Sequence, residues 1–420
     1  MKKIDKSEIL KIGKNAKEAS RVVSLLDPKL KNEILKAASE NLQHNSSIII
    51  DENRKDVEEN KDKLTSATLD RLVLDEKRIK SMCEGLEDIS RLDDPIGKIL
   101  DKWDRPNGLK IEKVSIPLGV IGVIYESRPN VSADAAGLTL KSGNTLILRG
   151  GSESFNSSSK IVSLINQTYR DFNLPIGTLQ YIPTTDRSAV GYMLNMDDFI
   201  DVIIPRGGKS LIERVLTDSK VHVIRHLDGI CHTYIHKKSD PNLCKEVTFN
   251  AKMRRPGICG ATETILIDYE VLNSHLHMII TALQNEGCLV KGDKEILKIN
   301  DSIELADETD WATEYLDKII SIKTIKGGVK EAVNHINEYG SGHTDAILSE
   351  DQLAVDYFLN YVDSGIVMHN TSTQFADGGE FGMGAEIGIS TSKVHARGPV
   401  GVAQLTSFKY KVLGTGQIRP

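Results

Sequence analysis

Apolar positions recur at helical spacing through residues 5–95 of this chain. Within residues 29–42, one apolar stripe is formed by Leu30, Ile34, Leu35, Ala38 and Leu42. Polar residues fill the intervening positions, and Asp27 followed by Pro28 supplies a helix start. Residues 94–97, Asp-Pro-Ile-Gly, then break the pattern. We therefore expect the N-terminal part to consist of amphipathic helices.

The next pattern predicts a hairpin. Two short strand-like stretches, residues 99–103 and 109–116, flank the step Asn107-Gly108, which is typical of a tight β-turn. A hairpin that projects from a domain often mediates contact between subunits. A terminal strand is expected at 403–413, and it could pair with this hairpin in its own chain or in a partner.

Apolar runs and helical patterns then alternate in two regions. The first has expected strands at 120–125, 145–149, 179–182, 199–204 and 221–224, and helices at 133–141, 157–169, 190–195 and 211–216. The second has expected strands at 231–236, 263–267, 318–324, 344–348 and 365–368, and helices at 241–253, 271–285, 328–336 and 350–361. Each rhythm predicts a doubly wound parallel sheet, so the fold class is α/β with two such domains.

Composition narrows the function classes. The net charge is −6, whereas a general nucleic-acid binder usually carries a basic excess. The five cysteines form no CxxC pair, which argues against a disulfide framework or a zinc knuckle. We therefore expect neither a metal site nor a nucleic-acid partner. We also expect no membrane span, because no apolar run of about 18 residues occurs. The N-terminus lacks a signal-peptide core, so a cytoplasmic enzyme with reduced thiols is expected.

Standard nucleotide motifs are incomplete. Residues 205–210 resemble the end of a Walker A loop, but Ile203 stands where that loop needs glycine. No GxGxxG follows a predicted strand. Gly207 and Gly208 nevertheless join a strand to a helix, where backbone N–H groups can hold a phosphate. A tight turn without a ligand explains the two glycines equally well.

Cys259 is the strongest candidate for chemistry. Pro256-Gly257 ends a predicted helix, so the cysteine lies in a loop between glycines. Nearby cations, namely Lys252, Arg254 and Arg255, favour a thiolate. The alternative is a buried core cysteine, the usual environment of a free thiol.

Two further segments hold candidate side chains. His226, Asp228 and Cys231 lie close together in sequence, but no second ligand cluster supports a metal site. His226 or Asp228 facing a site is the better interpretation, and a hydrogen-bonded core histidine remains an alternative. Asn130 follows the strand 120–125, at the sheet edge where open α/β folds bind ligands. It could stabilise an oxyanion or cap the next helix.

Several segments together resemble the γ-glutamyl phosphate reductase (glutamate-5-semialdehyde dehydrogenase) family of the aldehyde dehydrogenase superfamily. They are residues 69–72, 116–131, 140–144, 148–153, 204–208, 225–229, 255–259, 339–345, 382–391 and 395–399. Each motif is weak alone, but the ordered set spans nearly the whole chain. The resemblance implies an aldehyde dehydrogenase-like fold with two doubly wound domains and a β-hairpin oligomerisation arm. It implies an NADP-binding domain at 1–98 and 118–227, a catalytic domain at 228–395, and an arm at 99–117 and 396–420.

The resemblance also implies the reaction: NADPH-dependent reduction of L-glutamyl 5-phosphate to L-glutamate 5-semialdehyde and phosphate, the second step of proline synthesis. By matching position, Cys259 is the nucleophile and Asn130 an oxyanion donor. The matching cofactor residues are Arg149, Gly207, Gly208 and Glu314. We expect Arg254, Arg255, His226 and Asp228 to bind substrate. A homo-oligomer is expected, and transient channelling with glutamate 5-kinase is compatible with this role.

Two departures from the superfamily pattern bear on mechanism. Residues 226–229 lack the glutamate with which hydrolytic members activate water, which agrees with a thioester that meets phosphate or hydride. Gln374 stands where an arginine is expected. Two other functions fit the residues: a coenzyme A-acylating aldehyde dehydrogenase, and a non-redox thiol hydrolase that uses Cys259 with His226.

Overall fold

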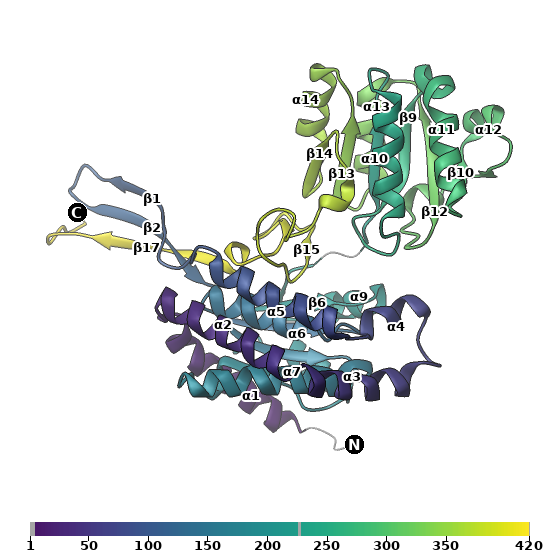
Figure 1. Ribbon diagram of the computed structural model, residues 1–420. Helices are drawn as coiled ribbons and strands as arrows, with labels where there is room; N and C mark the ends of the chain where they lie inside the picture. Colours follow the sequence, from purple (N-terminus) through teal and green to yellow (C-terminus); the bar gives the residue numbers. More distant parts are fainter. Residues whose placement is uncertain (1–4, 226–227, 420) are drawn as a thin grey trace. The chain divides into compact units, whose positions relative to one another are not determined.

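The computed structural model describes residues 5–225 and 228–419 and divides into two compact units (Figure 1). The first unit comprises Met1–Arg225, Gly382–Gly388 and Pro399–Pro420. The second comprises His226–Phe381 and Ile389–Gly398.

The predicted N-terminal helices are present. They are α1 (Lys6–Val23), α2 (Pro28–His44), α3 (Ser46–Asn60), α4 (Ser66–Leu72) and α5 (Glu76–Arg91). The predicted start of α2 is confirmed, because the Asp27 carboxylate accepts a hydrogen bond from the Lys29 amide. Four stripe residues of α2 are buried and Leu30 is half-buried. This apolar face packs α2 against α5 and α7.

The first unit contains a five-stranded parallel sheet in the order β5-β4-β3-β6-β7. Its strands are β3 (Val120–Tyr125), β4 (Thr145–Gly150), β5 (Leu179–Tyr181), β6 (Val202–Arg206) and β7 (His222–Val223). Its helices are α6 (Val131–Lys141), α7 (Phe155–Asp171), α8 (Ser188–Leu194) and α9 (Lys209–Asp218). Every residue of β3 and β4 is buried, as expected for strands covered on both faces.

A three-stranded antiparallel sheet in the order β1-β2-β17 belongs to the same unit. The predicted hairpin is formed by β1 (Ile99–Asp104) and β2 (Lys110–Pro117). The terminal strand β17 (Thr406–Leu413) pairs with β2 of its own chain. Within this chain, β17 therefore takes one of the two arrangements that the sequence left open.

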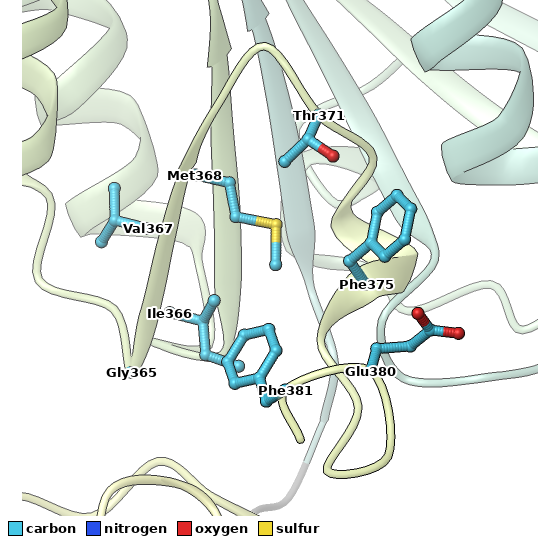
Figure 2. Close-up of a pocket in the computed structure, with 8 residues that line it drawn as sticks. All are labelled: Gly365, Ile366, Val367, Met368, Thr371, Phe375, Glu380 and Phe381. Carbon is cyan, nitrogen blue, oxygen red and sulfur yellow. The ribbon is translucent and has the colours of Figure 1, made fainter. Parts of the chain in front are cut away.

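The second unit contains a seven-stranded parallel sheet in the order β11-β10-β12-β9-β8-β13-β14. The predicted strands are β8 (Cys231–Ile235), β9 (Thr262–Asp268), β12 (Ile319–Ile325), β13 (Thr344–Leu348) and β14 (Ile366–His369). The predicted helices are α10 (Pro241–Met253), α11 (Leu272–Asn285), α13 (Gly328–Tyr339) and α14 (Gln352–Tyr361). Figure 2 shows the edge strand β14 and the segment that follows it.

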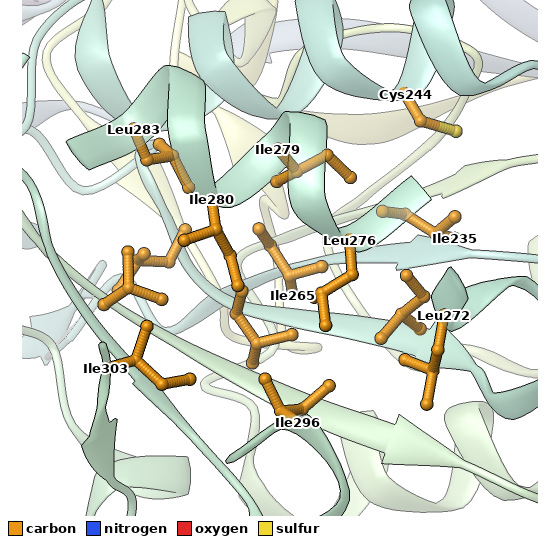
Figure 3. Close-up of a cluster of buried hydrophobic side chains, with 14 of the residues drawn as sticks. Ile235, Cys244, Ile265, Leu272, Leu276, Ile279, Ile280, Leu283, Ile296 and Ile303 are labelled. Carbon is orange, nitrogen blue, oxygen red and sulfur yellow. The ribbon is translucent and has the colours of Figure 1, made fainter. Parts of the chain in front are cut away.

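Three elements at the other edge were not predicted: β10 (Leu289–Gly292), α12 (Lys294–Ile299) and β11 (Glu304–Leu305). Val290 of β10 and Ile296 of α12 belong to a buried aliphatic cluster that also includes Ile265 and Ile280 (Figure 3). Two-residue strands β15 (Ile389–Ser390) and β16 (Gly398–Pro399) lie in the glycine-rich tail. Short 3-10 turns complete the described residues: η1 (Ser152–Ser154), η2 (Ile176–Thr178), η3 (Tyr269–Val271), η4 (Asp310–Ala312), η5 (Thr373–Phe375) and η6 (Ala403–Leu405).

Candidate functional site

Cys259 lies in the loop that joins α10 to β9. The helix starts on an Asp240 cap and ends before Pro256, so the chain must turn there. A tight turn follows, in which the Ala261 amide donates to the Ile258 carbonyl over 3.0 Å. The cysteine itself is partly exposed. The predicted loop position is therefore confirmed.

The other four cysteines are all buried, and the structure describes all five. Burial raises the pKa of Cys83, Cys244 and Cys288 to about 11. It raises the pKa of Cys231 well above its usual value. A thiolate is the reactive form of cysteine, so these four thiols are unsuited to attack at neutral pH. Cys259 is the one cysteine of the five that is not buried.

The backbone of Cys259 packs against Gly229 so closely that a side chain there would not fit. A Cβ built on Gly229 would lie 2.1 Å from the Cys259 carbonyl oxygen and 2.6 Å from its Cα. The Gly229 amide donates to Glu314 Oε1 over 2.8 Å. The buried Cys231 thiol donates to the Cys259 carbonyl over 3.1 Å. Residues 229–231 and Glu314 therefore form a support beneath Cys259.

The three cations near Cys259 in sequence have different environments. Arg254 and Arg255 are exposed, as a site for anions requires. Lys252 is fully buried and forms an ion pair with the equally buried Glu263. Because this charge is compensated inside the core, the expectation that Lys252 supplies positive charge to the cysteine is wrong.

Asn130 and its surroundings lie in the first unit. The side chain of Asn130 makes no capping hydrogen bond to α6, so the alternative role as a helix cap is not observed. Its amide donates instead to Asp134 Oδ2 over 2.9 Å. Burial raises the pKa of Asp134 to about 6, against the lowering effects of Asn130 and Arg206.

Gly207 and Gly208 are exposed at the start of α9. The Gly208 amide donates to Glu126 Oε2 over 3.0 Å, so this N–H points at a carboxyl oxygen. A Cβ on Gly207 would lie 2.4 Å from the same oxygen. Donors of this kind fit a phosphate of the expected cofactor. The buried Arg149 donates to the carbonyls of Gly150 and Thr185, and its Nε has no partner among the described atoms.

The structure thus brings Cys259, Gly229 and Glu314 into one site. Asp228 is half-buried beside Gly229, whereas His226 lies outside the described residues. Sequence reasoning did not foresee the supporting role of Gly229. A glycine at the entrance to a predicted strand is a signal for close backbone approach, and it could have found this contact.

Described residues of the second unit line at least two cavities. One, of about 530 Å³, is lined by apolar residues of β14 and by Phe375 and Phe381 (Figure 2). The other, of about 510 Å³, is lined by Arg254 and Gln374 among others. None of the helices in residues 5–225 and 228–419 combines the length and the apolar character needed to cross a bilayer.

Comparisons with known proteins place the chain in a family. The sequence model of the aldehyde dehydrogenase family matches residues 1–288. A gamma-glutamyl phosphate reductase of Rhodospirillum rubrum is 55% identical, over 98% of this chain and 96% of that protein. One of Paramagnetospirillum magneticum is 52% identical, over 97% of both chains.

Solved structures agree. The gamma-glutamyl phosphate reductase of Thermotoga maritima has a TM-score of 0.95 and 40% identity, covering 98% of this chain and 100% of its own. An acetylating aldehyde dehydrogenase of Geobacillus thermoglucosidasius shares the fold alone, with a TM-score of 0.71 and 14% identity over 99% of this chain and 98% of its own. The chain belongs to the γ-glutamyl phosphate reductases of the aldehyde dehydrogenase family.

Proposed function

We propose that this protein reduces L-glutamyl 5-phosphate to L-glutamate 5-semialdehyde and phosphate with NADPH, as the second step of proline synthesis in the cytoplasm. Family membership supports the substrate class and implies a nicotinamide cofactor. The observation that carries the mechanism is Cys259, the one partly exposed cysteine, in a loop with two exposed arginines.

The reaction begins at the Cys259 sulfur. The thiolate attacks the acyl phosphate carbonyl, and the resulting tetrahedral oxyanion collapses with cleavage of the acyl C–O bond. Phosphate leaves with the bonding electron pair, and the exposed cation Arg255 offsets its charge. The product of this half-reaction is a glutamyl thioester on Cys259. NADPH, when bound, supplies the hydride that reduces the thioester carbon. Collapse of the second oxyanion returns the electron pair to sulfur and releases the aldehyde.

Oxyanion stabilisation is assigned to the Asn130 amide and the Cys259 backbone N–H. Each such donor contributes about 3–4 kcal/mol in known enzymes. Asp134 accepts from the Asn130 amide and so fixes the orientation of that donor. Gly207, Gly208 and Arg149 are assigned to the cofactor's phosphates and adenosine, Glu314 to its nicotinamide ribose, and His226 and Asp228 to substrate.

The domain roles follow the same proposal. Residues 1–98 and 118–227 bind the cofactor, 228–395 carry the chemistry, and 99–117 with 396–420 form an oligomerisation arm. Strand β17 of the arm leaves Tyr410 and Val412 more than half exposed, as an interface with a second copy requires. Transient channelling of the substrate from glutamate 5-kinase is part of the same proposal.

One assay tests the proposed reaction. Purified protein is given L-glutamate 5-semialdehyde and NADP, with either phosphate or coenzyme A as the acyl acceptor. We expect NADPH to form when phosphate is the acceptor and not when coenzyme A is. This activity should be lost in Cys259→Ser. Activity with coenzyme A in place of phosphate would favour the acylating alternative, and undiminished activity of Cys259→Ser would refute the thioester route.

A further inference from the structure

The cavity of about 510 Å³ in the second unit has a mixed charge pattern. Arg254 contributes a cation from the end of α10, and Glu246 contributes a carboxylate from the same helix. Glu380 contributes a second carboxylate from the segment after η5. All three side chains are exposed. A cavity with one cation and two carboxylates on its walls suits a zwitterion better than a simple anion.

Gln374 joins the two sides of this cavity. Although its side chain is almost completely buried, it makes polar contacts at both ends of its amide. Its Nε2 donates to the Ala251 carbonyl over 2.9 Å and to the Arg255 carbonyl over 3.5 Å. Its Oε1 accepts from Arg254 Nη1 over 3.4 Å. Gln374 therefore satisfies carbonyls left open at the end of α10 and holds the Arg254 guanidinium in place.

An arginine at position 374 could not make this arrangement. A guanidinium has no acceptor atom, so it would lose the bond to Arg254 and would place a second positive charge beside it. The neutral amide instead leaves Arg254 as the cation of this cavity wall. With arginine at position 374, that residue would present the positive charge. With glutamine there, Arg254 presents it.

The nucleophile is next to this wall. Gly260, the residue after Cys259, faces η5: a Cβ built on it would lie 3.3 Å from the Thr373 carbonyl oxygen and 3.9 Å from the Gln374 Cα. The hydroxyls of Thr262 and Thr373 are 3.0 Å apart and connect the start of β9 to η5. The turn that carries Cys259 is therefore packed against the segment around η5, and residues of that segment form part of the cavity wall.

We propose that this cavity binds the amino-acid end of the substrate, that Arg254 pairs with its α-carboxylate, and that Gln374 is the positioning residue of Arg254. The α-ammonium group lies toward the carboxylates of Glu246 and Glu380. This inference deepens the proposed function and rests on it for the identity of the substrate. It leaves Arg255 as the cation for the departing phosphate.

The first test compares two aldehydes in the phosphate-dependent oxidation: L-glutamate 5-semialdehyde and butyraldehyde, which lacks both charged groups. In Arg254→Gln, we expect KM for the semialdehyde to rise about 10- to 100-fold, as for loss of one charge-assisted bond, with butyraldehyde kinetics unchanged. Arg254→Lys should restore part of the loss. The control is Lys294→Gln, which removes an exposed charge from α12 and should change neither substrate. An equal effect of Arg254→Gln on both aldehydes would overturn the assignment.

The positioning role has its own signature. Gln374→Met keeps the length of the side chain but removes its hydrogen bonds, so KM for the semialdehyde should rise while kcat changes less. Gln374→Arg should raise KM in the same way, although it adds a positive charge. A lower KM in Gln374→Arg would show that position 374 itself can bind the carboxylate, and would overturn the positioning role.

A second measurement needs no turnover. Saturating L-glutamate should slow the alkylation of Cys259 by iodoacetamide in the wild type but not in Arg254→Gln. Butyrate should slow the alkylation in neither protein. Absence of protection in the wild type would overturn the cavity assignment. If protection is seen but the semialdehyde is not oxidised, the proposed reaction fails and the amino-acid site stands.

Discussion

Gly229→Ala tests whether the support beneath Cys259 controls the reaction. Gly229 is not among the described glycines that have a positive φ. Alanine at this position therefore meets no backbone strain. The added methyl group would instead meet the Cys259 carbonyl oxygen at 2.1 Å, and an ordinary contact of 3.4 Å requires a retreat of about 1.3 Å. The obstacle is backbone, which cannot rotate away as a side chain can.

A displacement of about 1 Å at a reacting group can cost about 100-fold in rate, equivalent to about 2.7 kcal/mol of transition-state stabilisation. Overpacking of this kind costs about 1–3 kcal/mol of folding stability. We therefore expect kcat/KM for phosphate-dependent oxidation of the semialdehyde to fall about 100-fold, while circular dichroism still shows a folded protein at 25 °C.

The matched control is Gly191→Ala in α8, where the nearest neighbour of the new methyl group is Arg214 Nη2 at 3.8 Å. It should keep the wild-type rate and unfold no earlier, because alanine favours a helix over glycine. A Gly229→Ala enzyme with the wild-type kcat/KM would refute the supporting role of Gly229.

Three further predictions follow from the described contacts. Iodoacetamide should alkylate native Cys259 and spare the four buried cysteines, as peptide mass spectrometry can show; labelling of Cys231 at a similar rate would contradict its burial. Glu314→Gln replaces the carboxylate that accepts from the Gly229 amide with a weaker amide acceptor, so kcat/KM should fall about 10-fold. Steady-state kinetics should show part of this loss as a higher KM for NADPH. The raised pKa of Asp134 means that the folded state binds more protons than the unfolded state between about pH 4 and pH 6. This carboxyl therefore lowers the free energy of unfolding as pH rises through that window, and urea titrations of Asp134→Asn should lack that part of the slope.

Much of the fold could be predicted because the periodicity of a long segment indicates whether it forms a helix or a strand. The strand β3 has the predicted bounds, since a fully apolar run flanked by glycine and a polar loop leaves little choice. The region of β10, α12 and β11 was missed because its strands are short and its sequence is rich in lysine and aspartate. Short elements of this kind depend on tertiary packing, which a local pattern does not contain.

The site was predicted less completely. Cys259 could be singled out because its loop is bounded by glycines. The other four cysteines are excluded as candidate nucleophiles by their burial, which is a property of the packed structure. Lys252 was misinterpreted because distance in sequence was taken for distance in space. It lies on the buried face of α10 with Cys244, Thr248 and Ala251, a helical spacing that the sequence does carry. The role of Gln374 depends on contacts more than a hundred residues apart and had no local signal.

The central claim is that Cys259 carries the acyl group. Rapid mixing of the enzyme with L-glutamate 5-semialdehyde and NADP, without phosphate, measures this directly through NADPH absorbance. The thioester route predicts a burst of about one NADPH per active site, followed by a slow phase that phosphate accelerates, and no burst in Cys259→Ala. A wild-type enzyme that shows no burst without phosphate yet turns over normally with it would contradict the claim.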